Sequence, residues 1–206
     1  AGWQTRGSDN WGPVKALMAH HTATPASRPG DYTSLAIVRD GRLPPDPSPV
    51  PGPLSQLGLG RSGTVYVIAS GKAHHAGVGR TPPGVVTFDG SSQSLGCEAE
   101  HPGGNAPWTP RQYDAYVQLF SIVADHLNLK TSQVVGHKEW ATPPGRKPDP
   151  TFLMGSFRAD IDRVRSPDMA TIPRDAKADD GDPTLAPTVQ RAIAAGVATV
   201  HTQAGG

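Results

Sequence analysis

The sequence has 206 residues and only one cysteine, Cys97, so no disulfide can form within the chain. This excludes a small secreted fold held together by disulfide bonds. No apolar run approaches the about 20 residues needed to cross a bilayer. Charge of either sign is also in short supply: 19 basic and 18 acidic residues leave a formal net charge of +1. That balance argues against a nucleic-acid partner, which usually requires a concentrated basic face.

The chain divides near Ser166. Residues 1–166 carry an excess of basic side chains, and residues 167–206 carry an excess of acidic ones. The second part starts with a stretch rich in Pro, Gly and Asp, which is typical of a linker. Apolar residues then recur every four positions and predict one short amphipathic helix; they are Leu185, Val189, Ile193 and Val197. We therefore expect a folded domain over 1–166 and a linker with a helical appendage over 167–206.

Hydrophobic periodicity predicts an α/β fold, with a mixed central β-sheet flanked by helices. Strands are expected at residues 16–20, 64–69, 94–100 and 133–135, and helices at 31–40, 109–127 and 151–165. In the segment 94–100, Leu95, Cys97 and Ala99 share one face, while Glu98 and Glu100 lie on the other. Prolines crowd residues 44–53 and predict a stiff, extended loop there.

Three side chains at the ends of these elements form a candidate metal site. His20 and His21 end the first strand, His137 follows the last strand, and Asp149 comes twelve residues later. Two imidazoles and a carboxylate suit zinc, and three protein ligands leave a fourth position open for water. The spacing alone is weak, because Asp149 followed by a proline also fits the start of a helix. Adjacent strand residues point to opposite faces, so only one of the two neighbouring histidines can meet the metal.

Four blocks of the sequence, at residues 20–23, 75–77, 94–100 and 136–150, resemble the type 2 family of N-acetylmuramoyl-L-alanine amidases in the same order. This family of zinc hydrolases is related to peptidoglycan recognition proteins. The resemblance covers roughly residues 2 to 165 and includes a lysine two positions before the last ligand. It implies an α/β fold like that of the peptidoglycan recognition proteins. It makes residues 1–166 a zinc amidase catalytic domain.

The resemblance also implies a role for individual residues. The metal ligands of one Zn²⁺ per chain would be His20, His137 and Asp149. Both glutamates of the strand expected at 94–100 qualify by face as the general base, and the family pattern selects Glu98, which follows Gly96-Cys97, with Glu100 in reserve. Lys147 would stabilise the oxyanion, and His75 would contact the substrate.

One segment departs from the family pattern. Many relatives have a histidine in the place of Gln56, and some have a catalytic tyrosine in the place of Ser55. A mechanism that uses this tyrosine is therefore in doubt, and the pair of Glu98 and Lys147 is favoured.

The resemblance predicts hydrolysis of the amide between the lactyl group of muramic acid and L-alanine in peptidoglycan. A binding module without activity is the alternative, although such modules lose a metal ligand. We expect a monomer with peptidoglycan as its partner and no membrane partner. It would act on the cell wall, either as a secreted enzyme or as a phage endolysin released at lysis. The first ten residues are polar and show no signal peptide.

Overall fold

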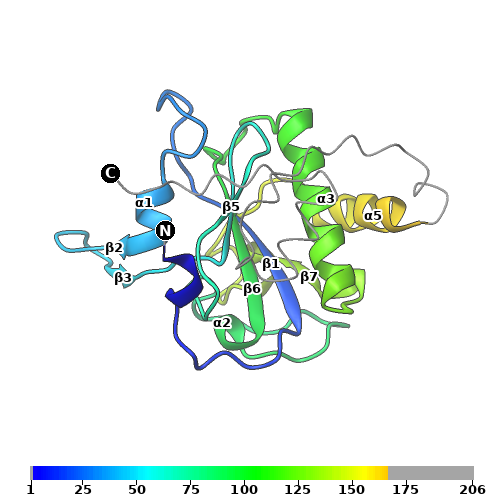
Figure 1. Ribbon diagram of the computed structural model, residues 1–206. Coiled ribbons are helices and arrows are strands. Elements are labelled where there is room, and N and C mark those ends of the chain that lie inside the picture. Colours follow the sequence, from blue (N-terminus) through cyan, green and yellow to red (C-terminus); the bar gives the residue numbers. More distant parts are fainter. Residues whose placement is uncertain (1, 167–206) are drawn as a thin grey trace.

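The computed structural model describes residues 2–166, and in this part of the chain a five-stranded sheet forms the centre (Figure 1). The strands are β1 (Ala16–His21), β4 (Leu57–Leu59), β5 (Val65–Val67), β6 (Ser94–Ala99) and β7 (Val134–Gly136). Their order is β5-β4-β6-β1-β7, with only the β4–β5 pair antiparallel. The predicted mixed α/β class is confirmed. The predicted C-terminal helix and the boundary after Ser166 concern residues outside the described part.

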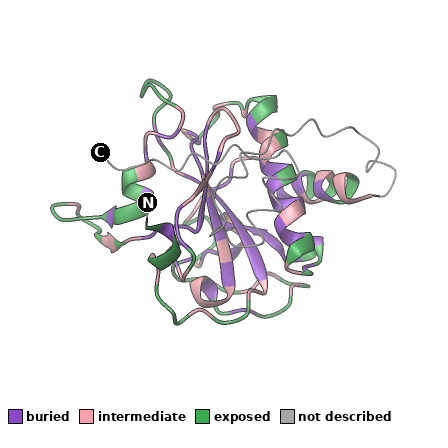
Figure 2. Cartoon of the chain, in the orientation of Figure 1, coloured by how far each residue is buried: buried purple, intermediate pink, exposed green. Residues whose placement is uncertain are grey.

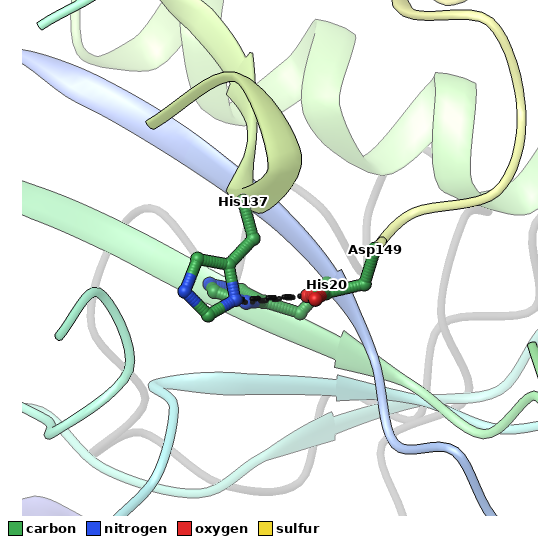
Figure 3. A group of neighbouring side chains, drawn as sticks. All are labelled: His20, His137 and Asp149. Carbon is green, nitrogen blue, oxygen red and sulfur yellow. Dashed lines mark hydrogen bonds and ion pairs between the residues drawn. The ribbon is translucent and has the colours of Figure 1, made fainter. Parts of the chain in front are cut away.

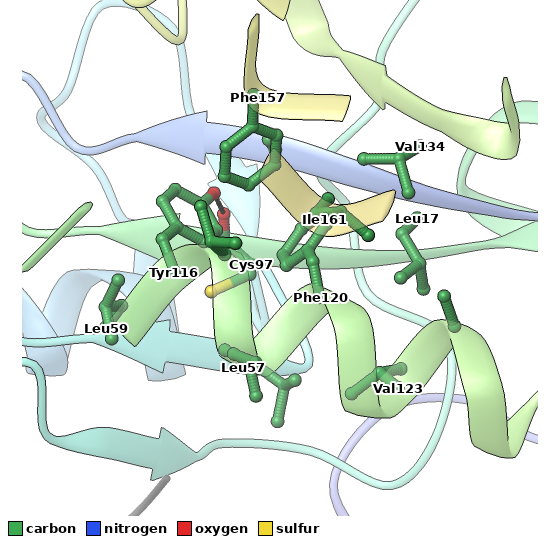
Figure 4. Packing of buried hydrophobic residues seen from close by; sticks show 14 of the residues in the cluster. Leu17, Leu57, Leu59, Cys97, Tyr116, Phe120, Val123, Val134, Phe157 and Ile161 are labelled. Carbon is green, nitrogen blue, oxygen red and sulfur yellow. Dashed lines mark hydrogen bonds between the residues drawn. The ribbon is translucent and has the colours of Figure 1, made fainter. Parts of the chain in front are cut away.

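Two long helices, α3 (Pro110–His126) and α5 (Met154–Arg165), cover one face of the sheet (Figure 1). Thr109 caps the first of them, because its side chain accepts a hydrogen bond from the Gln112 N–H, while the Gln112 side chain donates to the carbonyl oxygens of Gly60 and Glu100. Between helices and sheet lies the larger core, whose buried surfaces are visible in Figure 2 and whose packing appears in Figure 4. It includes Leu17, Cys97, Tyr116, Phe120, Phe157 and Ile161.

The opposite face of the sheet has a smaller core. The buried residues there are Ala16, Met18, Ala76, Phe88, Val135 and Trp140. The short elements of the chain are α1 (Leu35–Asp40), α2 (Gly90–Gln93), α4 (His137–Trp140), the pair β2 (Gly41–Arg42) and β3 (Val50–Pro51), and the 3₁₀ turns Trp3–Thr5 and Thr131–Gln133. Because side chains alternate along a strand, β1 sends Leu17 and Ala19 to the larger core and Met18 to the smaller one.

Several predicted boundaries move for identifiable reasons. The first helix begins at Leu35 rather than at residue 31, and the N–H groups of Thr33 and Ser34, just before it, donate to the Glu100 carboxylate. The last helix begins at Met154, so Asp149 is not its N-cap. The proline-rich segment is not the one extended loop predicted: residues 44–48 form turns and bends, and only Val50–Pro51 is extended and pairs with Gly41–Arg42. No helix within residues 2–166 is long and apolar enough to cross a membrane.

Candidate metal centre

The sheet and one loop bring His20, His137 and Asp149 into a single cluster (Figure 3). His20 lies near the end of β1, and His137 directly follows β7, which pairs in parallel with β1. Asp149 lies on the loop between α4 and α5, and its carbonyl oxygen accepts a 2.7 Å hydrogen bond from the Lys138 N–H. All three side chains are buried. The sequence prediction that these residues converge is confirmed.

The facing atoms of the cluster suit a cation. His20 Nδ1 lies 3.0 Å from His137 Nδ1 and 3.1 Å from Asp149 Oδ2, and His137 Nδ1 lies 2.9 Å from the same oxygen. Ligand atoms of a tetrahedral zinc site would be about 3.3 Å apart, given bond lengths of about 2.0–2.1 Å. The three atoms therefore need only a small outward shift to hold zinc.

The protonation of the two imidazoles strengthens this fit. His137 Nε2 lies 3.1 Å from the Ala76 carbonyl oxygen, which can only accept, so Nε2 carries the hydrogen. Burial, together with the neighbouring His137 ring, lowers the pKa of His20 to about 4, so His20 is neutral at pH 7. His137 Nδ1 faces the Asp149 carboxylate at 2.9 Å, and this contact requires either a proton or a metal cation between the two atoms.

His21 lies on the other face of the sheet, as strand alternation requires. Its ring centre is 5.8 Å from that of His101 and 6.5 Å from that of Trp108. His101 itself stacks on Trp108 with 4.0 Å between ring centres. The sequence alone does not show which of the two neighbouring histidines joins the cluster. In the fold, His20 reaches the cluster and His21 does not.

Glu98 stands beside the cluster on the next strand, where it is the register partner of His20. It lines a cavity of about 520 Å³ together with Lys147, His137 and Asp149. Its Oε2 atom is buried and has no hydrogen-bond partner in the described part of the chain. Burial raises the pKa of the Glu98 carboxyl to about 8; the charge of Asp149 adds to this effect and Lys147 opposes it. An unpartnered carboxyl in a cavity is available for proton transfer.

Glu100 is two residues further along the same face, but its surroundings are different. It is fully buried, and its carboxylate accepts hydrogen bonds from the N–H groups of Thr33 at 3.0 Å and of Ser34 at 3.4 Å, and from both hydroxyls. Arg61 adds an ion pair at 3.8 Å. These contacts tie β6 to the segment before α1, so Glu100 has a structural task and no free oxygen for catalysis.

His75 lines the same cavity, but most of its side chain is buried beside His20. Only 6% of it is accessible, and its Nδ1 and Nε2 atoms lie 3.1 Å from His20 Nε2 and 3.2 Å from the Ser94 carbonyl oxygen. Both ring nitrogens therefore have partners within the protein, and the substrate contact expected for His75 stays a prediction.

The segment that departs from the family pattern is part of the framework. Ser55 and Gln56 are both buried, and the Ser55 hydroxyl donates to the Leu57 carbonyl oxygen at 2.6 Å. Gln56 accepts a 2.8 Å hydrogen bond from the Gly96 N–H and donates to the Gly71 carbonyl oxygen at 3.2 Å. Neither residue lines the cavity of the cluster.

Three further residues were not found from the sequence. Arg42 and Arg146 add positive charge to the cavity lining. Tyr116, from α3, lies under the site: its hydroxyl oxygen accepts from the His20 N–H at 2.9 Å and lies 2.8 Å from the Cys97 carbonyl oxygen. Its helical spacing marks it only as a core residue, and no local signal reveals this contact with two strands.

Comparison with known proteins places this fold and site in a family. The model of the family described as N-acetylmuramoyl-L-alanine amidase matches residues 10–152, which include all three residues of the cluster. No curated protein sequence matches the chain.

Solved amidase structures share the fold at low sequence identity. The chain is similar to AmiD from E. coli, solved in complex with anhydro-N-acetylmuramic acid-L-Ala-D-γ-Glu-L-Lys, with 22% identity and a TM-score of 0.53 over 76% of this chain and 60% of that one. For AmpD the identity is 20% and the TM-score 0.54, over 77% and 96% of the two chains. For LysC from Clostridium intestinale the identity is 20% and the TM-score 0.50, over 78% of this chain and 92% of that one. The chain thus spans 60% of the length of AmiD. On the match of the family model over most of its length, this chain belongs to the N-acetylmuramoyl-L-alanine amidase family.

Proposed function

We propose that the protein is a zinc-dependent amidase that cleaves the bond between the lactyl group of muramic acid and L-alanine in peptidoglycan. The observation that carries the proposal is the cavity in which the three facing ligand atoms and the unpartnered Glu98 carboxyl lie together. Membership of the amidase family and the muramyl peptide bound to AmiD support the choice of substrate.

The metal would be held by His20, His137 and Asp149, whose donor set matches zinc. Zinc bound there supplies a more acidic water and polarises the carbonyl group under attack. Glu98 takes the proton of the attacking water and returns it to the amine nitrogen of the departing L-alanine. The Lys147 ammonium, which lines the same cavity, stabilises the negative charge that develops on the carbonyl oxygen.

We further propose that the protein acts on the cell wall as a monomer, with residues 1–166 as the catalytic domain and 167–206 as an appendage. A secreted bacterial enzyme and a phage endolysin released at lysis are both consistent with this proposal.

The test is zinc-dependent release of stem peptides from purified peptidoglycan. The zinc-loaded chain should release peptides with a new L-alanine amino terminus, identified by mass spectrometry. Removal of the metal with a chelator should abolish this release, and added zinc should restore it. If the zinc-loaded chain sediments with the wall but releases nothing, it is a binding module instead. If activity survives complete removal of the metal, the proposed chemistry is wrong.

A further inference from the structure

Behind the metal cluster, a chain of hydrogen-bonding groups runs from His20 to the backbone of β6. His20 Nε2 lies 3.1 Å from His75 Nδ1, and His75 Nε2 lies 3.2 Å from the carbonyl oxygen of Ser94. The two rings meet edge to face, with 5.2 Å between their centres. His75 is thus the partner of the ring nitrogen of His20 that faces away from the cluster.

The Ser94 carbonyl oxygen, at the end of this hydrogen-bonded series, sets the direction of the hydrogen bonds. The Ser94 carbonyl oxygen can only accept, so His75 Nε2 carries a hydrogen and, in a neutral ring, Nδ1 accepts. His20 must then donate from Nε2, which leaves a lone pair on its Nδ1 toward His137 and Asp149. The opposite order would place a hydrogen on His20 Nδ1, at the position where a metal would bind.

The surroundings of His75 hold its ring in place. The ring lies against Gly96, where a Cβ atom would come within 2.8 Å of His75 Cγ and Nδ1. The Ser91 hydroxyl accepts hydrogen bonds from the His75 N–H at 3.3 Å and the Ala76 N–H at 3.0 Å. Gln56 fixes Gly96 through a 2.8 Å hydrogen bond to its N–H. Glycine is therefore required at position 96 by the close approach of this ring.

We propose that His75 is a positioning residue that keeps His20 in the tautomer with its hydrogen on Nε2, so that Nδ1 is ready to bind the metal. Carboxylates, backbone carbonyls and water usually take this part beside a metal-bound histidine. Here the partner is a second imidazole, that of His75, which in turn is hydrogen-bonded to the backbone carbonyl of Ser94. The inference rests on the proposed metal site and gives His75 a role in addition to the substrate contact that the sequence resemblance implies.

Zinc affinity of the full chain, measured by competition with a chromophoric chelator, tests the proposal. His75→Ala should weaken zinc binding by about 10- to 100-fold, the usual effect of removing such a partner. His75→Asn keeps an acceptor near the position of Nδ1 and should recover part of the loss. His74→Ala, at the exposed neighbouring position, is the matched control and should bind zinc normally. Gly96→Ala displaces the ring without removing a polar atom, and it should also weaken binding.

Long-range ¹H–¹⁵N NMR of the imidazoles in the metal-free chain reads the tautomers directly, and circular dichroism verifies that each variant folds. Hydrogen on His20 Nε2 in the unmodified chain, lost or exchanged with Nδ1–H in His75→Ala, supports the proposal. Hydrogen on His20 Nδ1 in the unmodified chain would overturn it. So would full zinc affinity of folded His75→Ala with only the KM for muropeptide raised. If the unmodified chain binds no zinc, the proposed function fails, while the tautomer still decides this inference.

Discussion

Two glutamates on the same face of β6 should respond in opposite ways to the same substitution. Glu98 lines the cavity of the cluster and has an oxygen without a hydrogen-bond partner in the described residues. Glu100 is fully buried, and its carboxylate accepts several hydrogen bonds. We predict that Glu98→Gln lowers turnover without loss of stability, and that Glu100→Gln lowers stability without loss of turnover per folded molecule. Because an amide has nearly the shape of a carboxylate, the two variants differ from the parent only in charge and in hydrogen bonding.

The size of the stability effect follows from the donors around Glu100. The hydroxyls of Thr33 and Ser34 can rotate and accept from an amide, but their backbone N–H groups can only donate. These two N–H groups donate to different oxygens, Thr33 to Oε1 and Ser34 to Oε2. Either orientation of a glutamine therefore leaves one buried N–H group facing an NH₂ group. A buried donor left unsatisfied costs about 1–3 kcal/mol, so Glu100→Gln should lower the free energy of unfolding by about that amount.

Glu98→Gln loses no hydrogen bond of its Oε2 atom, since none is made in the described residues, and should unfold at the same or a higher urea concentration than the parent. Its turnover should fall about 10²- to 10⁴-fold, the usual contribution of a positioned acid–base group. Urea denaturation of the metal-free chains and initial rates on soluble muropeptide, normalised to folded protein, measure both quantities. A stable Glu100→Gln variant with lost turnover, or an active Glu98→Gln variant, would refute this division of roles.

Three other predictions concern the ligands, the pH dependence and the tail. His20→Ala should abolish stoichiometric zinc binding, and His21→Ala should retain it, since the two rings lie on opposite faces of the sheet; metal analysis that shows zinc in both would refute the ligand assignment. Burial lowers the pKa of His101, so protonation of this residue opposes folding, and the free energy of unfolding should decline as pH falls below about 6.5. The decline should be less steep in His101→Asn, which keeps an acceptor for the Gly103 N–H. If urea titrations give the same dependence of stability on pH for both proteins, this cause is excluded. A chain that ends at Asp175 should keep its fold, zinc and activity on soluble muropeptides, and failure to fold would place residues 176–206 in the core.

The alternation of side chains in β1 and β6 could be predicted from the sequence, because a strand has a period of two. Leu95, Cys97 and Ala99 pack toward α3 and α5, and Glu98 and Glu100 lie on the other face, as the pattern predicts. The helix that starts after Thr109 and the strand before His137 also follow from local chemistry, namely a capping residue and a short apolar run.

Only the tertiary structure determined which members of each set form the site. Periodicity shows that His20 and His21 point to opposite faces of the sheet. Which of these faces carries His137 and the loop of Asp149 depends on where the long helices pack. Likewise, Glu98 and Glu100 share a face, and only the segment before α1 makes one of them structural. These contacts join residues that are far apart in the sequence and are brought together by the sheet. The positions of neighbouring strands, rather than any local preference, decide which side chain reaches the cluster.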